Sequence, residues 1–245
     1  MTRLDELRPD VGVIFAKPPE PGNVKTRLIG RLEPAETARL YRAFLHDVAD
    51  RLADFASRRD ADMTPVLAYT GDPEHPSFEH FRKRDFAMIP QGDGNLGDKL
   101  QSVTERCFSH GARRLVVIGS DSPTLMDRHL ARAYRALAQN DVVLGPSFDG
   151  GYYLVGLTNP APRLFADIDW STPDVLEQTV ARCRELDLLP LLTEFWYDVD
   201  TFADLQRLRF HLLEYLSKRD QTVATRTAEL LRDLDDRGVF DGECS

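Results

Sequence analysis

Short runs of apolar residues alternate along this chain with longer segments whose apolar positions recur every three or four residues. The short runs predict buried strands, and they lie at 11–16, 65–69, 86–89, 114–119, 141–144, 152–157 and 188–195. The longer segments predict amphipathic helices. They lie at 33–56, from 97 past 107, from the end of a turn at 120–123 to about 138, and at 173–186, 201–217 and 223–234. Strands therefore alternate with helices over most of the length.

This alternation predicts the α/β class, with a mainly parallel central sheet and helices on both faces. The length of 245 residues fits one domain of this class. We expect an N-terminal extension at 1–10, the domain at 11–217 and a C-terminal helical tail at 218–245. Ligands of such sheets bind beyond the carboxyl ends of the strands. The loops after Ala16, Gly119, Leu144 and Phe195 are therefore where we expect a site.

Composition and charge narrow the class of ligand. The chain has 31 Lys and Arg residues against 40 Asp and Glu, a net charge of −9, which argues against nonspecific nucleic-acid binding. No apolar run approaches the length of a membrane span. The three cysteines are far apart, which is typical of reduced thiols in the cytoplasm. We expect small-molecule partners and a monomer or a homodimer.

The loop after the first strand gathers positive charge. Lys17, Lys25 and Arg27 lie there, and Gly22 permits close approach of the backbone to a ligand. Lysine and arginine both provide positive charge for a phosphate, and the arginine guanidinium adds a planar fork of hydrogen-bond donors. The loop lacks the Gly-Lys-Ser/Thr ending of a Walker loop. The alternative is a solvated basic loop.

Two later loops carry aspartates after strands. Asp121 follows the clearest strand and is placed to hold a divalent cation that bridges phosphates. The alternative is that Asp121 or Ser122 caps the next helix, with Pro123 in its first position. Asp198 and Asp200 have alternate spacing, so both point to one face of an extended segment, and such a pair needs a cation or donors. The alternative there is an exposed strand end with Asp200 or Thr201 as a helix cap.

The segment Asp149-Gly150-Gly151 lies between two strands. It is typical of a hairpin turn, or of a loop whose glycines let the backbone approach a ligand that Asp149 contacts. Together with the basic loop, the aspartates form the parts of a metal-dependent nucleotide site, in which Mg²⁺ or Mn²⁺ neutralises a diphosphate.

Five segments strengthen this interpretation as a set. They are FAKPPEPGNVKTRL at 15–28, QGDGNLG at 91–97, GSDSP at 119–123, DGGYYLVGL at 149–157 and WST at 170–172. Over residues 11–210 the chain resembles the radical-SAM/selenodomain-associated transferases, first described as a domain of unknown function. That family is similar to nucleotide-diphospho-sugar transferases of the Rossmann-like GT-A fold. Some of its members are named as glycosyltransferases of arsenosugar biosynthesis.

The resemblance implies roles for particular residues. It implies a metal-bearing carboxylate at Asp121 and a second metal-binding element at 198–201 with Asp198 and Asp200. It places Asp149, Gly150 and Gly151 at the acceptor side. The turn around Asp121 reads GSDSP where many relatives have Thr and Cys, but the carboxylate is kept. Trp170 stacks on a sugar or base, or else anchors the following helix. The full set of predicted nucleotide-contacting residues is Ala16, Lys17, Gly22, Lys25, Thr26, Arg27, Gly97, Ser120, Gly150, Gly151 and Trp170.

Three functions follow from these patterns. The first is glycosyl transfer from a nucleoside diphosphate sugar to a small acceptor, with Asp149 as base and Lys25 and Arg27 on the phosphates. The second is nucleotidyl transfer from a nucleoside triphosphate, because Lys17 followed by Lys25 to Leu28 also resembles phospholactate guanylyltransferases. The third is a nucleotide-binding module without catalysis.

Overall fold

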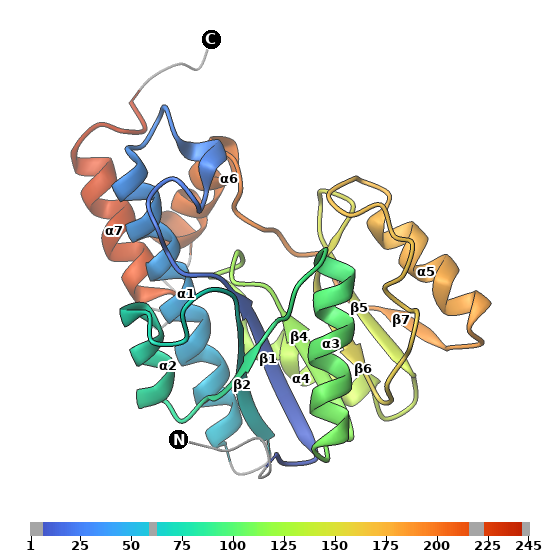
Figure 1. Cartoon of the computed structure of the whole chain (residues 1–245). Helices are drawn as coiled ribbons and strands as arrows, with labels where there is room; N and C mark the ends of the chain where they lie inside the picture. Colours follow the sequence, from blue (N-terminus) through green and yellow to red (C-terminus); the bar gives the residue numbers. More distant parts are fainter. Residues whose placement is uncertain (1–6, 59–62, 216–222, 242–245) are drawn as a thin grey trace. The chain divides into compact units, whose positions relative to one another are not determined.

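A computed structural model describes residues 7–58, 63–215 and 223–241 of the chain (Figure 1). By its internal contacts the chain divides into two compact units, each described by itself below. The unit that we call the sheet unit comprises residues 1–18, 51–119 and 126–197. The unit that we call the helical unit comprises residues 19–50, 120–125 and 198–245.

Among the described residues, seven strands form one sheet in the order β3-β2-β1-β4-β6-β5-β7. Their bounds are β1 Asp10–Ala16, β2 Met63–Tyr69, β3 Ala87–Pro90, β4 Arg114–Ile118, β5 Val142–Pro146, β6 Tyr152–Leu157 and β7 Pro190–Leu192. Only β6 runs antiparallel to its neighbours, β4 and β5; the other neighbouring pairs are parallel. The predicted α/β class is confirmed.

The helices also follow the predicted pattern. Their bounds are α1 Pro34–Ser57, α2 Glu79–Lys83, α3 Leu96–Ser109, α4 Asp127–Ala136, α5 Val175–Glu185, α6 Phe202–Arg209 and α7 Thr225–Asp236. Short 3-10 turns cover Thr26–Leu28 and Pro76–Phe78, and a π-helical turn covers Phe210–Tyr215. None of the helices in the described parts of the chain is long and apolar enough to cross a membrane.

Helices cover both faces of the sheet. On one face, Leu100 of α3 and Cys183 of α5 belong to the same buried cluster as Leu115 of β4. On the other face, Gly12 of β1 leaves room for α1, because a Cβ at this position would lie 2.7 Å from a Leu52 methyl. Alternating strand residues thus pack against different helices, as in other α/β sheets.

Two helices begin or end at residues other than those predicted. The alternative that placed Pro123 in the first position of a helix is wrong, because the Ser122 carbonyl accepts a hydrogen bond from the Leu125 N–H at 3.0 Å in a separate turn, and α4 begins at Asp127. The predicted cap at Thr201 is confirmed, because its hydroxyl accepts a hydrogen bond from the Asp204 N–H at 3.3 Å. The helix that follows changes to the π-helical turn at Phe210, and its predicted last residues, 216–217, lie outside the described residues.

A buried histidine fixes the start of α4 in the sheet unit. His129 Nδ1 accepts a hydrogen bond from the Met126 N–H at 3.0 Å, and the side chain has no exposed surface. The centroids of the His129 and Trp196 rings are 4.4 Å apart. Burial, together with the nearby Arg128 guanidinium, lowers the pKa of His129 to about 4, because both disfavour the charged imidazolium.

The lowered pKa of His129 predicts a stability that depends on pH. Between about pH 6.5 and 4 the unfolded chain binds a proton that the folded chain excludes, so the free energy of unfolding falls as the pH falls. The expected loss is about 2–3 kcal/mol over this window, at about 1.4 kcal/mol per unit of pKa shift. Urea unfolding at several pH values measures it.

The matched variant is His129→Gln, because glutamine at this helix position also accepts a bond from the capping N–H. This variant lacks the titrating imidazole. Between pH 7 and pH 4 its free energy of unfolding should therefore fall by about 2–3 kcal/mol less than that of the wild type. Equal pH dependence in the two proteins would contradict this account of His129.

Candidate functional site

The loop that carries Lys25 is folded so that this side chain points inward. Val24 and Leu28 are fully buried on either side of it. Lys25 adopts a left-handed backbone conformation with φ of 48° and precedes the 3-10 turn. Its side chain is only 4% exposed. The lysine that we predicted as a phosphate ligand is therefore buried within the helical unit.

Lys25 joins three loops of the helical unit through its ammonium group. Nζ lies 2.5 Å from Asp121 Oδ1 and 3.0 Å from Asp200 Oδ1, and it donates a hydrogen bond to the Val199 carbonyl at 2.6 Å. The Phe44 ring of α1 lies with its centroid 5.7 Å from Nζ, which is within the range of a cation–π contact. Two predicted metal ligands therefore meet on one cation, which comes from the basic loop.

Further bonds hold the same loops together. The Val199 N–H donates to the Asp121 carbonyl at 3.0 Å, and the Ser122 hydroxyl donates to Asp198. Ser120, a predicted nucleotide contact, is buried, and its hydroxyl lies 2.8 Å from the Tyr41 hydroxyl. Asp198 thus accepts a hydrogen bond from Ser122, whereas Asp200 pairs with Lys25. The negative charge of each carboxylate is therefore stabilised by a different donor.

The electrostatics of the cluster favour a charged lysine. Burial by itself would lower the pKa of Lys25, but the carboxylates of Asp121 and Asp200 outweigh burial and raise its pKa above the ordinary value, because nearby opposite charges favour the ammonium form. The ammonium therefore persists at neutral pH. Asp121 and Asp200 remain 40% and 42% exposed, so solvent and ligands can reach these two carboxylates while the lysine is enclosed.

Two carboxylates at one point suit a divalent cation of the magnesium kind, which takes one or two of them and completes its shell with water and phosphate oxygens. Asp121 and Asp200 have this chemistry and exposure. Within the described residues, however, no group of three or more His, Cys, Asp or Glu side chains is arranged to hold a metal. The assignment of Asp121, Asp198 and Asp200 as metal ligands stays a prediction.

The remaining predicted residues of the basic loop lie at the surface. Lys17, Gly22, Thr26 and Arg27 are all exposed. Arg27 forms no ion pair with any residue that the structure describes, so its guanidinium is available to an anion. Ala16 is buried, and its carbonyl accepts a hydrogen bond from the Gln91 amide at 3.1 Å. That bond leaves the Ala16 carbonyl engaged at the end of β1.

The hairpin between β5 and β6 presents Asp149 to solvent. Its Oδ1 accepts hydrogen bonds from the Ser147 hydroxyl and from the Gly151 N–H, the latter at 3.0 Å. Within the described residues, Oδ2 has no hydrogen-bond partner. The carboxylate is therefore held in one orientation while one oxygen stays open to a ligand.

Gly150 and Gly97 have structural roles that their sequence context did not reveal. Gly150 has φ of +90°, and a Cβ there would lie 2.0 Å from the Pro173 carbonyl oxygen. A Cβ at Gly97 would lie 2.4 Å from the Phe165 carbonyl oxygen and 2.8 Å from Trp170 Nε1. Trp170 also packs at the edge of the core cluster, which supports its alternative role as an anchor.

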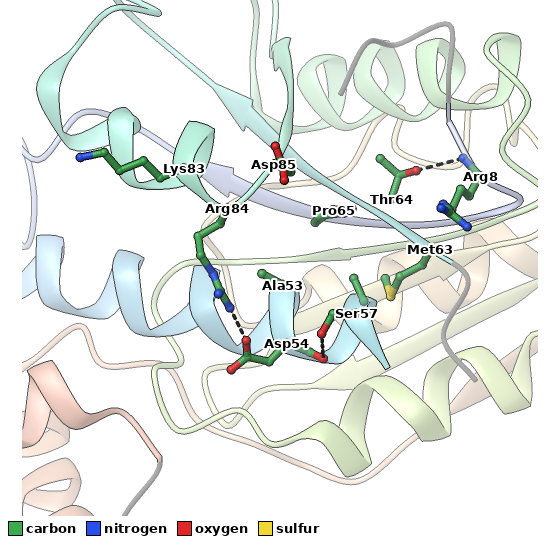
Figure 2. A pocket seen from close by; sticks show the side chains of 11 residues that line it. Arg8, Ala53, Asp54, Ser57, Met63, Thr64, Pro65, Lys83, Arg84 and Asp85 are labelled. Atoms are coloured by element: carbon green, nitrogen blue, oxygen red, sulfur yellow. Dashed lines mark hydrogen bonds and ion pairs between the residues drawn. The ribbon is translucent and has the colours of Figure 1, made fainter. Parts of the chain in front are cut away.

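A cavity at the amino end of β2 contains none of the predicted site residues. Figure 2 shows Arg84 reaching Asp54 across it, and Thr64 accepting a hydrogen bond from the backbone N–H of Arg8 at 2.9 Å. Because the cavity is at the amino end of β2, it lies at the opposite end of the sheet from the Asp149 hairpin, which follows the carboxyl end of β5. Residues 59–62, which precede β2, lie outside the described residues.

Comparison with known proteins identifies the family. Residues 46–172, just over half of the chain, match the family described as "Uncharacterized protein conserved in bacteria (DUF2064)". The chain belongs to the DUF2064 family. Its matched part includes Asp121 and Asp149 and excludes Lys25 and Asp200. No curated protein matches the sequence.

Solved structures extend the likeness beyond the DUF2064 segment. A protein of Desulfovibrio desulfuricans G20, provisionally named a nucleotide-diphospho-sugar transferase, is 31% identical, with a TM-score of 0.78 over 93% of this chain and 95% of that chain. A cytidylyltransferase of Leptospira borgpetersenii is 13% identical, with a TM-score of 0.53 over 97% and 98%. A CMP:2-keto-3-deoxy-manno-octonic acid synthetase, complexed with CTP, is 14% identical, with a TM-score of 0.54 over 84% and 99%.

These structures confirm the predicted GT-A-like, nucleotide-transferase type of fold. The two cytidylyl-transferring proteins are similar to this DUF2064 member in fold alone, because their identities are low. The association with radical-SAM proteins stays a prediction.

The contacts of the paired glycines predict different tolerances to substitution. In Gly150→Ala the added methyl meets the Pro173 backbone and the positive φ is strained. The free energy of unfolding should therefore fall by about 2 kcal/mol or more. In Gly151→Ala the nearest contact, at 3.3 Å, is a side-chain oxygen of Asp149, so the cost should stay below about 1 kcal/mol. Urea unfolding of both variants tests this, and equal costs would contradict it.

Lys25→Met tests the central ion pairs. It leaves Asp121 and Asp200 facing each other without a cation, and both carboxylates are partly exposed. The free energy of unfolding should fall by about 2 kcal/mol, less than for a fully buried pair, because solvent screens the carboxylates. Arg27→Met, in the same loop but without an ion pair, should cost about 0.5 kcal/mol or less. Chemical denaturation at pH 7 measures both, and equal losses would refute the assigned role of Lys25.

Proposed function

We propose that this DUF2064 protein is a metal-dependent glycosyltransferase that moves a sugar from a nucleoside diphosphate sugar to a small acceptor. The observation that carries the proposal is the convergence of Asp121 and Asp200 on one cation position. The 31% identity to a protein provisionally named a nucleotide-diphospho-sugar transferase supports the same class. The proposed partners are small molecules only.

The donor would be held through its diphosphate. Arg27 is exposed without an ion pair among the described residues, and its planar guanidinium suits two phosphate oxygens. Asp121 and Asp200 would hold Mg²⁺ or Mn²⁺ by their exposed oxygens. When bound, the cation would neutralise negative charge on the leaving diphosphate. Lys25 keeps the two carboxylates together, so its contribution to the reaction is through their position.

The acceptor would be activated by Asp149. The acceptor hydroxyl oxygen forms a bond to the anomeric carbon, while the bond from that carbon to the diphosphate oxygen breaks and its electron pair leaves with the nucleoside diphosphate. The hydroxyl proton passes to the open Oδ2 of Asp149. Ser147 and Gly151 orient the base by binding its other oxygen.

Nucleotide-dependent stabilisation tests this function. A nucleoside diphosphate sugar at about 100 times its Kd should raise the free energy of unfolding by about 2.7 kcal/mol in the presence of Mn²⁺. The measurement is thermal unfolding with UDP- and GDP-sugars and with CTP and GTP, each with Mn²⁺ and with EDTA. Stabilisation by triphosphates alone would favour nucleotidyl transfer, and no stabilisation by any nucleotide would favour a different function.

The matched control separates the metal site from general charge. Asp121→Asn should abolish the part of the stabilisation that depends on Mn²⁺. Asp236→Asn, which neutralises an exposed aspartate on α7 of the same unit, should leave it unchanged. Retention of the metal-dependent part in Asp121→Asn would overturn the assignment of this residue.

A further inference from the structure

Two aromatic side chains of the sheet unit lie exposed and stacked beside Asp149. Phe148 is 72% exposed and Phe195 is 54% exposed. Their ring centroids are 5.6 Å apart with an interplanar angle of 23°, which is an offset stack. Single exposed apolar residues are ordinary in proteins, whereas contiguous exposed apolar groups beside polar residues are typical of interaction sites.

Backbone bonds hold the two rings at fixed positions. Ser147 and Trp196, each next to one of the phenylalanines, form a separate parallel bridge beyond the paired residues of β5 and β7. The Trp196 N–H donates to the Pro146 carbonyl at 3.0 Å. The two phenylalanines thus project from neighbouring extended segments at the edge of the sheet.

The layer under Phe195 is also anchored. The centroid of the Trp196 ring lies 4.4 Å from that of the buried His129 ring and 5.4 Å from the Arg128 guanidinium carbon. The Tyr153 hydroxyl donates to the Glu194 carbonyl at 3.2 Å. A surface whose support is already ordered loses little conformational entropy when a ligand binds.

Asp149 adds a directional polar group to this surface. It directly follows Phe148, and its Oδ2 stays open, so it can accept a hydrogen bond from a hydroxyl or amino group. A carboxylate repels a phosphate placed beside it. The combination of two rings and one oriented carboxylate therefore selects the charge of the ligand as well as its apolar body.

The geometry points to Phe148 and Phe195 as the platform for the acceptor: an uncharged or cationic alcohol or amine that carries an aromatic or apolar body. This inference rests on the proposed function, in which Asp149 is the acceptor's base. It adds the class of acceptor, and it excludes a phosphorylated one from this position.

The neighbouring edge strand argues against a second copy of the chain as the occupant. β7 has three residues, and its first is Pro190, which has no N–H to donate to an added strand. Short edge strands that contain proline resist pairing with another chain. Two aromatic rings and one carboxylate match the size of a small molecule, whereas a stable protein interface buries about 800 Å² on each partner.

The test uses 2-phenylethanol as the probe, with 2-phenylethyl phosphate as its anionic counterpart. Ligand-observed NMR titration of the full chain should give an affinity for the alcohol that is at least tenfold higher than for the phosphate. The double variant Phe148→Ala/Phe195→Ala should weaken binding of the alcohol at least tenfold. Asp149→Asn should reduce the preference for the alcohol over the phosphate.

The control is Phe210→Ala, because Phe210 is a comparably exposed phenylalanine, at 61%, in the helical unit. It should bind 2-phenylethanol as the wild type does. Binding within twofold of the wild type in the double variant, or equal loss in Phe210→Ala, would overturn the platform. A wild-type dimer that the double variant converts to a monomer would also overturn it, because the rings would then belong to a subunit interface.

The nucleotide measurement separates this inference from the proposed function. The double variant should keep the Mn²⁺-dependent stabilisation by a nucleoside diphosphate sugar. If the wild type shows that stabilisation but no preference for 2-phenylethanol, the platform is wrong and the proposed function stands. If no nucleotide stabilises the wild type but the probe binds at Phe148 and Phe195, the proposed function is wrong and the aromatic site remains as a binding surface.

Discussion

The loops of the helical unit depend on one buried ammonium group. Lys25 has a left-handed backbone and is buried. The left-handed conformation costs about 1–2 kcal/mol for a residue with a side chain, and burial removes the hydration of the ammonium. The carboxylates of Asp121 and Asp200 and the carbonyl of Val199 offset both costs. Without the lysine, the two carboxylates would repel each other. The ammonium therefore holds together three segments that lie far apart in the sequence and that no shared helix or strand connects.

The regular elements could be predicted because their causes are local. The apolar run of β4 and the helix cap at Thr201 each carry their signal within a few residues, and both are confirmed. The start of α4 could not be predicted in the same way. Pro123 suits a first helical position, but Leu125 instead closes a turn on Ser122, and the helix begins only where His129 can accept a bond from Met126. That choice depends on the burial of His129 under Trp196, which is a tertiary contact.

The residues of the candidate site can be singled out from the sequence, but the side chains with which they pair cannot. The alternate spacing of Asp198 and Asp200 indicates two carboxylates that need compensation. The compensating groups are Lys25 and Ser122, and nothing in the sequence around residue 200 specifies either. Gly150 shows the same limit, because the backbone of Pro173 that requires a glycine there lies more than twenty residues away. Phe195 ends the strand predicted at 188–195, but β7 ends at Leu192 and the Phe195 ring is 54% exposed.

Under the proposed function, Lys25 would also influence how strongly a divalent cation binds to Asp121 and Asp200. One ammonium and two carboxylates carry a formal charge of −1, so Asp121 and Asp200 already have a counter-ion and the fold has no need of a divalent cation. The remaining charge is small, and two carboxylates alone hold magnesium weakly. A nucleoside diphosphate brings additional anionic oxygens and so raises the affinity for the cation. By linkage the cation raises the affinity for the nucleotide by the same factor. Under the proposed function, the buried lysine would thus make metal binding a property of the nucleotide complex instead of the folded chain.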